Sequence, residues 1–385
     1  MQSIPEQISS KLPGQGTSVF AVMTQLANEH NAINLSQGFP DFPVSEKLIS
    51  LVHQKMRGGF NQYAPMPGLP KLREEISRKT EFLYGARYNP DTEITITAGA
   101  TQAIYTAISA FVGEGDEVII FEPAYDSYVP AIKLHGGIPV FCALKLPDYH
   151  IDWEEVKKLI NTRTKMIIIN TPHNPTGSIL SASDMLQLQE ITRDTSILIL
   201  SDEVYEHIIF DGYEHQSVCR FPELAQRSLV MCSFGKTFHA TGWKLGYCVA
   251  PENLMKEFRK IHQFVVFTVN TPVQHAIAEY IQNPENYIHL GAFYAQKRDY
   301  FLQLISQSRF KPVPCNGTYF MVLDYSKISE EPEMEFATRL TREFGIASVP
   351  NAYFYHKKEN HQTLRFCFAK GDQTLEKAAE ILCRI

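Results

Sequence analysis

The chain has 385 residues, of which 44% are apolar and 20% charged, the balance of an ordinary globular protein with two or three domains. Its net charge of -6 provides none of the positive field that nucleic acid or an anionic membrane surface requires. No run approaches the ~18 apolar residues of a membrane-spanning helix, and the polar start of the chain lacks the apolar core of a secretory signal, so we expect a cytoplasmic protein.

Short apolar runs alternate with helical stretches from about residue 94 onward. The helical stretches include 103–115 and 183–195, and Ser183 is a candidate N-cap for the second. Because continuous Ile, Val and Leu runs are typical of strands buried on both faces, the pattern predicts an α/β fold whose mostly parallel sheet is covered by helices. The expected strands are 94–99, 117–123, 164–170, 196–202, 227–234 and 245–250.

The pattern changes after about residue 275 to long helical stretches, followed by strand-like segments at 310–325 and 363–371. This change predicts a separate, smaller α+β domain that the N-terminal arm joins. The stretch 351–362 is aromatic and charged, and we interpret it as a surface loop. The expected units are an arm at 1–40, a large domain at 41–275 and a small domain at 276–385.

Polar stretches follow several of the expected strands. In a mostly parallel sheet, ligands bind at the carboxyl ends of the strands, so we expect these stretches to meet in one site. They read TAGATQ, EPAYDSY, NTPHNPTG, SDEVYE and SFGKT.

Isolated motifs in these stretches permit other kinds of chemistry. The GKT of 235–237 lacks the first glycine of a P-loop, because Val230 stands there. Ser233 and Lys236 match the S-x-x-K of serine acyl-transfer enzymes, whose companion S-D-N and K-T-G elements are absent. Asp202 and Glu203 have no His or Cys at metal-ligand spacing, and the seven cysteines are scattered, so we expect no metal site and free thiols.

The ordered set of motifs resembles the fold-type I aminotransferases, which use pyridoxal 5′-phosphate. The resemblance runs from INLSQGFPDF at 33–42 to Arg365, and NLSQGFPDF with SFGKTFHATGWKLGY resembles the methionine and kynurenine aminotransferase branch. That branch includes cysteine-conjugate β-lyases, so a β-lyase that uses the same site is the alternative. A cofactor-free protein with a decayed aminotransferase fold is a further alternative, and the presence of the motif residues argues against it.

The resemblance implies a role for each residue around the cofactor ring. Lys236 forms the Schiff base and shuttles the substrate proton, which requires an amine with a lowered pKa. Asp202 holds the protonated ring nitrogen, while Tyr205 and Asn174 bond the ring hydroxyl oxygen. Tyr125 stacks on the ring face, with Tyr128 as the competing candidate.

The phosphate is expected at the start of a helix. Backbone N–H groups of Gly99, Ala100 and Thr101 face the anion there. Ser233 adds a hydroxyl, and Lys244 adds a cation where many relatives carry arginine; the kynurenine aminotransferase branch resembles this chain in having lysine. The resemblance also implies that Tyr63 reaches the phosphate of a neighbouring subunit in a homodimer.

Substrate recognition is implied by the same resemblance. Arg365 binds the α-carboxylate as a bidentate clamp, and Gly38 offers it a backbone N–H. Asn174 is also expected to contact the substrate. Since no second arginine for a distal carboxylate is evident, we expect methionine or aromatic donors, kynurenine included, and 2-oxo acid acceptors. The candidate side-chain pocket comprises Phe20, Phe39 and Phe267, with Tyr319 as a weaker member.

Overall fold

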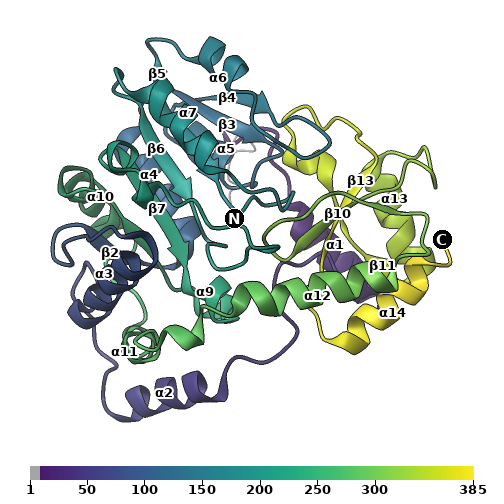
Figure 1. Cartoon of the computed structure of the whole chain (residues 1–385), viewed down its shortest axis with the longest axis horizontal. Coiled ribbons are helices and arrows are strands. Elements are labelled where there is room, and N and C mark those ends of the chain that lie inside the picture. The colour runs from purple at the N-terminus through teal and green to yellow at the C-terminus, as the bar shows by residue number, and fades with distance from the viewer. Residues whose placement is uncertain (1–8) are drawn as a thin grey trace, which may run out of the picture.

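The larger sheet of this computed structural model, which describes residues 9–385, has seven strands in the order β2-β8-β7-β6-β5-β3-β4 (Figure 1). β8 runs antiparallel to both of its neighbours, and the remaining pairs are parallel. The strands are β2 (Ile94–Thr97), β3 (Glu117–Glu122), β4 (Ile138–Ala143), β5 (Thr164–Asn170), β6 (Leu198–Asp202), β7 (Ser228–Ser233) and β8 (Gly246–Val249).

Every strand expected from the apolar runs is present to within two residues at each end, which confirms the predicted sheet. The prediction missed β4, because this edge strand is largely accessible to solvent and contains Pro139, so it lacks a continuous buried run. Ser183 is not the N-cap of the second helix. Ser181 accepts from the backbone N–H of Asp184 in a capping box instead, so the N-cap lies two residues earlier than predicted.

Helices cover both faces of this sheet, as the sequence predicts. On one face α4, α5 and α10 pack on alternate strand residues such as Val118 and Ile168, and on the other α3, α6, α7 and α11 pack on residues such as Ile119 and Ile167. No helix within residues 9–385 has the length and hydropathy of a membrane span. The helices around this sheet are α2 (Glu46–Arg57), α3 (Pro70–Tyr84), α4 (Gly99–Phe111), α5 (Tyr128–Leu134), α6 (Trp153–Leu159), α7 (Ala182–Thr192), α8 (Pro222–Ala225), α9 (Phe234–Thr237), α10 (Glu252–Val265) and α11 (Thr271–Tyr280).

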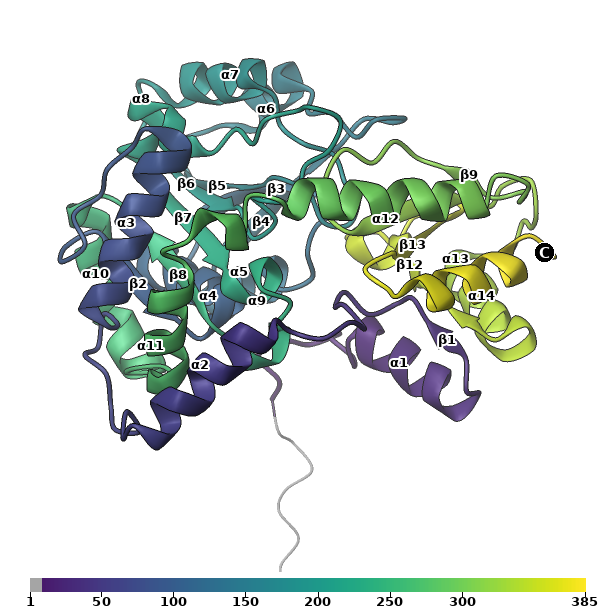
Figure 2. The same ribbon diagram turned by 60° about the horizontal axis from the view of Figure 1, so that its bottom comes forward.

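A smaller antiparallel sheet, of order β12-β13-β10-β9, lies beside the first and is linked to it by the long helix α12 (Figure 1). The N-terminal arm packs here, since β1 pairs in parallel with β11 and α1 contacts β11 and β12; Figure 2 shows α1 and β1 on the side of the smaller sheet. The predicted domain boundaries at 40 and 275 stay predictions. Residues 1–8 of the predicted arm, on which the expectation about a secretory signal rests, lie outside the described residues. The elements are α1 (Val19–Glu29), β1 (Ile33–Asn34), α12 (Leu290–Leu304), β9 (Lys311–Pro312), β10 (Phe320–Asp324), α13 (Glu333–Arg339), β11 (Ile346–Ala347), β12 (Val349–Pro350), β13 (Thr363–Cys367) and α14 (Asp372–Leu382).

The segment 351–362 is not simply the surface loop that its composition predicts. It begins with a 3₁₀ turn, η5 (Asn351–Phe354), in which Phe354 is buried and its carbonyl accepts from the Ala124 N–H at 2.8 Å. The backbone N–H of His356 donates to Glu122 Oε1, at the end of β3, at 2.6 Å. These contacts fasten the smaller sheet to the carboxyl edge of the larger one, so only the remainder of the segment is exposed.

A buried ion pair anchors the segment that follows β6. Lys79 on α3 donates to Glu206 at 2.7 Å, both side chains are 3% exposed, and the hydroxyls of Tyr84 and Tyr247 complete their hydrogen bonds. Burial acts to raise the pKa of Glu206, but the Lys79 ammonium outweighs it and holds that pKa well below its ordinary value. The chain after Asp202 is thereby fixed against α3.

Substitution of one partner of this pair tests how much the pair contributes to the stability of the fold. Lys79→Met leaves the Glu206 carboxylate buried without its cation, and we expect the free energy of unfolding at pH 7 to fall by about 3–5 kcal/mol. The matched control is Lys260→Met, which removes a half-exposed partner of Glu257 and should cost about 0–1 kcal/mol. Urea unfolding measures both, and equal shifts for the two variants would contradict the argument.

Candidate active site

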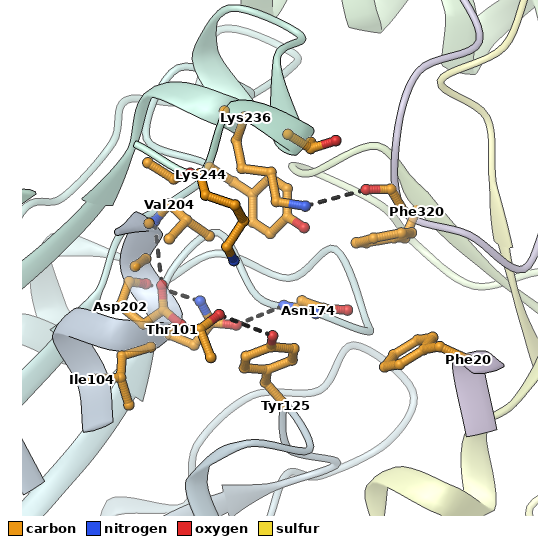
Figure 3. Close-up of a pocket in the computed structure, with 18 of the residues that line it drawn as sticks. Phe20, Thr101, Ile104, Tyr125, Asn174, Asp202, Val204, Lys236, Lys244 and Phe320 are labelled. Carbon is orange, nitrogen blue, oxygen red and sulfur yellow. Dashed lines mark hydrogen bonds between the residues drawn. The ribbon is translucent and has the colours of Figure 1, made fainter. Parts of the chain in front are cut away.

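A cavity of about 230 Å³ opens at the carboxyl edge of the larger sheet, where the predicted polar stretches meet (Figure 3). Strand pairing brings the ends together, because Asn170 pairs with Asp202 and Ser233 pairs with Gly246. All of the predicted residues except Tyr63, Phe39, Phe267 and the weaker candidate Tyr319 line this cavity. Those that do are Phe20, Gly38, Gly99, Ala100, Thr101, Tyr125, Asn174, Asp202, Tyr205, Ser233, Lys236, Lys244 and Arg365.

Lys236 projects from the short helix α9, directly after β7. Its Nζ donates to the Gly38 carbonyl at 3.1 Å and to the Tyr319 hydroxyl at 2.9 Å, both neutral acceptors. Burial, together with the nearby Arg365 and Lys244 cations, lowers the pKa of the amine to about 8. At pH 7 roughly one amine in ten is then unprotonated, against about one in 2,500 for a free lysine. Lys236 is therefore equipped to act as a nucleophile and a base.

Asp202 ends β6 and is 3% exposed. Its Oδ2 accepts from the Tyr128 hydroxyl at 2.6 Å, and Oδ1 accepts from the Val204 N–H at 3.4 Å. Burial raises the pKa of the carboxyl to about 6, while these hydrogen bonds and the Lys236 charge oppose the rise. Above pH 6 the side chain is mainly a carboxylate, and it can hold a cationic group in the cavity.

An anion-binding corner forms where β2 turns into α4. Gly99 adopts a φ of +75°, and a Cβ there would lie 3.3 Å from the Lys244 Nζ, so glycine keeps this corner open for a ligand. The first N–H groups of α4 and its positive dipole end face the same space. Ser233 lines the corner and its side chain does not cap α9, which leaves its hydroxyl for a ligand.

Arg365 lies on β13 at the other end of the cavity and is 1% exposed. Its guanidinium donates to Asn174 Oδ1 at 2.7 Å and to the Ser36 carbonyl at 3.0 Å, whereas its buried Nε has no partner. Within residues 9–385 no carboxylate forms a salt bridge with it, and burial lowers its pKa. A buried cation with only neutral partners is costly, and a ligand carboxylate would supply the missing charge.

Aromatic rings surround the space between these charged groups. Tyr125 borders the cavity, with its hydroxyl 3.4 Å from Thr101 Oγ1, so the structure places Tyr125 rather than Tyr128 at the cavity. Phe20 and Phe320 lie opposite Asp202 (Figure 3). Tyr319 contacts Lys236, and its hydroxyl donates to the Gly38 carbonyl at 2.7 Å. The Gly38 carbonyl thus accepts from both Lys236 and Tyr319. The predicted contact of the Gly38 N–H with a substrate stays a prediction.

Besides Tyr319, three predicted residues lie outside the cavity. Tyr63 is 82% exposed, and its ring meets the half-exposed ring of Phe267 edge to face at 5.5 Å. Phe39 points to the other side of the arm from Gly38, where the Lys370 ammonium lies 5.0 Å from its ring. Neither Phe39, Phe267 nor Tyr63 lines the cavity of its own chain, so their predicted roles stay predictions.

Sequence reasoning also missed functional positions. Phe320 lines the cavity and its ring lies 3.9 Å from the Arg365 guanidinium, although its stretch, TYFMVLDY, looks like any core strand. Asn170 bonds both the Asp202 carbonyl and the Asn174 N–H, and its place at the very end of TKMIIIN is the signal that could have identified it.

The residues present fit pyridoxal 5′-phosphate. That molecule carries an aldehyde, a basic ring nitrogen and a phosphate. The cavity offers an amine of lowered pKa at Lys236, a buried carboxylate at Asp202 and an anion corner that a Cβ at Gly99 would fill. Each group of the ligand thus meets a group of opposite or reactive character.

Known proteins resemble this chain throughout its length. Residues 30–382 match the family model described as aminotransferase class I and II. The chain is 48% identical to the methionine aminotransferase of Escherichia coli (strain K12), covering 97% of each chain, and 34% identical to a kynurenine–oxoglutarate transaminase of Dictyostelium discoideum, covering 96% of this chain and 94% of that one.

Solved structures agree with these sequence matches. The crystal structure of an Escherichia coli protein identified as a methionine aminotransferase has a TM-score of 0.97 at 47% identity, covering 99% of this chain and 100% of that chain. An N-succinyldiaminopimelate aminotransferase from Mycobacterium tuberculosis has a TM-score of 0.94 at 33% identity, covering 98% and 100%. The chain therefore belongs to the class I and II aminotransferases, transaminases that depend on pyridoxal 5′-phosphate and have the fold that its motifs predict.

Proposed function

We propose that this aminotransferase moves the amino group of methionine or of an aromatic amino acid, kynurenine included, to a 2-oxo acid. The observation that carries the proposal is the wall of the cavity around Arg365. Beside this clamp for an α-carboxylate stand the rings of Phe20 and Phe320, and the other cations that line the cavity are Lys236 and Lys244. A substrate with an apolar or aromatic side chain is favoured there, because the cavity lining within residues 9–385 has no second arginine to bind a distal substrate carboxylate. The names of the relatives support the same donors.

The proposed division of labour follows from the contacts. When bound, pyridoxal phosphate supplies the electron sink that makes the substrate Cα–H acidic. Arg365 binds the α-carboxylate, Lys236 takes the proton from Cα and returns it, and Asp202 holds the protonated ring nitrogen. Tyr205 and Asn174 bond the ring hydroxyl oxygen, and Tyr125 supports the ring face. The phosphate is held by Gly99, Ala100, Thr101, Ser233 and Lys244.

Amino-group transfer to a 2-oxo acid tests the proposal directly. We expect methionine, phenylalanine, tyrosine, tryptophan or kynurenine to be better donors than aspartate. Lys236→Ala should lose the visible cofactor absorbance that borohydride abolishes and slow transfer by at least ~10²–10⁴-fold, because no base remains at Cα. The exposed Lys260→Ala is the control, with activity within about twofold of wild type.

Two results would change the assignment. Full activity and absorbance in Lys236→Ala would contradict the role of that lysine. Release of pyruvate and ammonia from a cysteine S-conjugate without any 2-oxo acid, in the absence of amino-group transfer, would identify the enzyme as the β-lyase alternative.

The Arg365 clamp is tested by Arg365→Lys. Lysine keeps the charge but loses the planar fork, so we expect KM for the amino acid to rise by about 10- to 100-fold while affinity for the cofactor changes by less than about twofold. Arg298→Lys is the matched control, because Arg298 is a buried arginine that binds Asp211 at 2.6 and 2.7 Å outside the cavity. Steady-state kinetics measures both variants, and an unchanged KM in Arg365→Lys would contradict the proposed role of Arg365 in binding the α-carboxylate.

We further propose a homodimer with shared active sites, in the cytoplasm. Exposed apolar side chains support the dimer. Tyr63 contacts Phe267, and shortly before Phe267 in the chain come Phe264, which is 86% exposed, and Val265, which is 44% exposed. Exposed apolar patches on a protein surface mark interaction sites. A second copy would cover these side chains and receive Tyr63 near its phosphate corner. The cytoplasmic placement is supported by the cysteines, all of which are free thiols and all but Cys383 buried.

Mixing two inactive variants tests the shared site. Lys236→Ala and Tyr63→Ala subunits, dissociated and reassembled in equal amounts, give dimers in which one site has the lysine of one subunit and the tyrosine of its partner. We expect recovery of about a quarter of wild-type activity, since half of the dimers carry one intact site. A monomer by light scattering at micromolar concentration, or no recovery on mixing, would contradict the proposal.

A further inference from the structure

Tyr128, the first residue of α5, is 2% exposed and lies against Asp202. It follows Tyr125 by three residues, and the two rings meet edge to face with centroids 5.6 Å apart. Tyr125 lines the cavity, but Tyr128 does not. Its hydroxyl instead donates to Asp202 Oδ2 at 2.6 Å. The two tyrosines of EPAYDSY therefore have different roles: Tyr125 borders the ligand cavity, and Tyr128 binds the Asp202 carboxylate.

The Asp202 carboxyl has few other hydrogen-bond donors, so the bond from Tyr128 is important to it. Tyr128 is the side-chain donor to the carboxyl, and the Val204 N–H adds a long contact at 3.4 Å. Burial keeps the Tyr128 pKa well above its ordinary value, so the hydroxyl stays a donor. The other titratable groups that face the carboxyl are Lys236 on α9, Glu203, Tyr125 and Tyr205.

We propose that Tyr128 is a positioning residue of the cofactor site, whose hydroxyl holds the Asp202 side chain ionised and directed so that it can hold the ring nitrogen of the cofactor. This inference rests on the proposed role of Asp202. The hydrogen bond is short, buried and made to a charged acceptor, the kind that contributes most. Tyr128 acts through Asp202 and touches neither cofactor nor substrate.

The proposal predicts a particular dependence on pH. Burial raises the pKa of Asp202 to about 6, and the Tyr128 hydrogen bond opposes that rise. Loss of the hydroxyl moves the pKa upward, by about one to two units for a hydrogen bond to a charged group. A ligand that needs the carboxylate loses affinity as the pH falls through this pKa, and in the variant the loss begins at a higher pH.

The experiment uses Tyr128→Phe in the full chain freed of cofactor. The probe is pyridoxamine 5′-phosphate, which has no aldehyde and forms no covalent bond with Lys236, so its dissociation constant reports the non-covalent contacts. We expect the variant to bind about five- to fifty-fold more weakly than wild type at pH 6, and less than about twofold more weakly at pH 8.5. Carbon-13 NMR of the Asp202 carboxyl should show a titration midpoint about one unit higher or more.

Two further variants separate this effect from simple packing. Tyr294→Phe is the matched control, because Tyr294 is fully buried near Tyr319 and its hydroxyl has no hydrogen-bond partner; affinity should stay within about twofold at both pH values. In an Asp202→Asn background, Tyr128→Phe should change the affinity by the same factor at pH 6 and pH 8.5, because no carboxyl remains to titrate.

The possible outcomes distinguish failure of the proposed role of Tyr128 from failure of the proposed role of Asp202. A loss in Tyr128→Phe that is equal at both pH values, or absent at both, overturns the role of Tyr128 and leaves that of Asp202 standing. If Asp202→Asn itself binds pyridoxamine phosphate as tightly as wild type at both pH values, the proposed role of Asp202 fails, and this inference fails with it.

Discussion

The burial of the Lys236 amine with only neutral hydrogen-bond acceptors is the constraint on which the site depends. An ammonium loses most of its hydration there, and this loss lowers its pKa to about 8. A carboxylate partner would restore the high pKa of an ordinary lysine, and the acceptors at Nζ are instead a carbonyl and a hydroxyl, from Gly38 and Tyr319. One acceptor comes from the N-terminal arm and the other from the smaller sheet. The arm and the C-terminal part of the chain therefore supply the two neutral partners of the amine.

The acidic run after β6 shows how the fold separates chemistry from support. Asp202 faces the cavity, whereas Glu203 accepts from Ser201, the Val218 N–H and His215, and Glu206 pairs with Lys79. Both glutamates are buried and fully engaged, so they hold the backbone on either side of Val204 and Tyr205. The position of Tyr205 in the cavity wall is a consequence of these pairs. Asp202 and the two nearby glutamates thus have different roles because their side chains point to different sides of the backbone.

Much of the fold and of the site could be predicted from the sequence, because continuous apolar runs identify central strands and the motifs follow their carboxyl ends. The edge strand β4 escaped, since partial exposure removes the pattern on which such predictions rest. Phe39 lies beside Lys370, whereas Gly38 lines the cavity, so the predicted substrate contact of Phe39 stays a prediction. Tyr63 and Phe267 are exposed in one chain, so any site for them depends on a second molecule. The bond between Tyr128 and Asp202 joins α5 to β6, a contact 74 residues apart that no local pattern predicts.

The reversed direction of β8 has a consequence for the dimensions of the ligand. Ser233 pairs with Gly246, and the Phe234 N–H donates to the Leu245 carbonyl at 3.0 Å, so Lys236 and Lys244 stand on one segment closed by main-chain hydrogen bonds. The separation between the backbone of Lys236 and that of Ser233 and Lys244, the members of the anion corner on this segment, is then set by two paired strands. Substitutions elsewhere in the core can shift this segment as a unit, and the length of molecule that it accommodates stays the same.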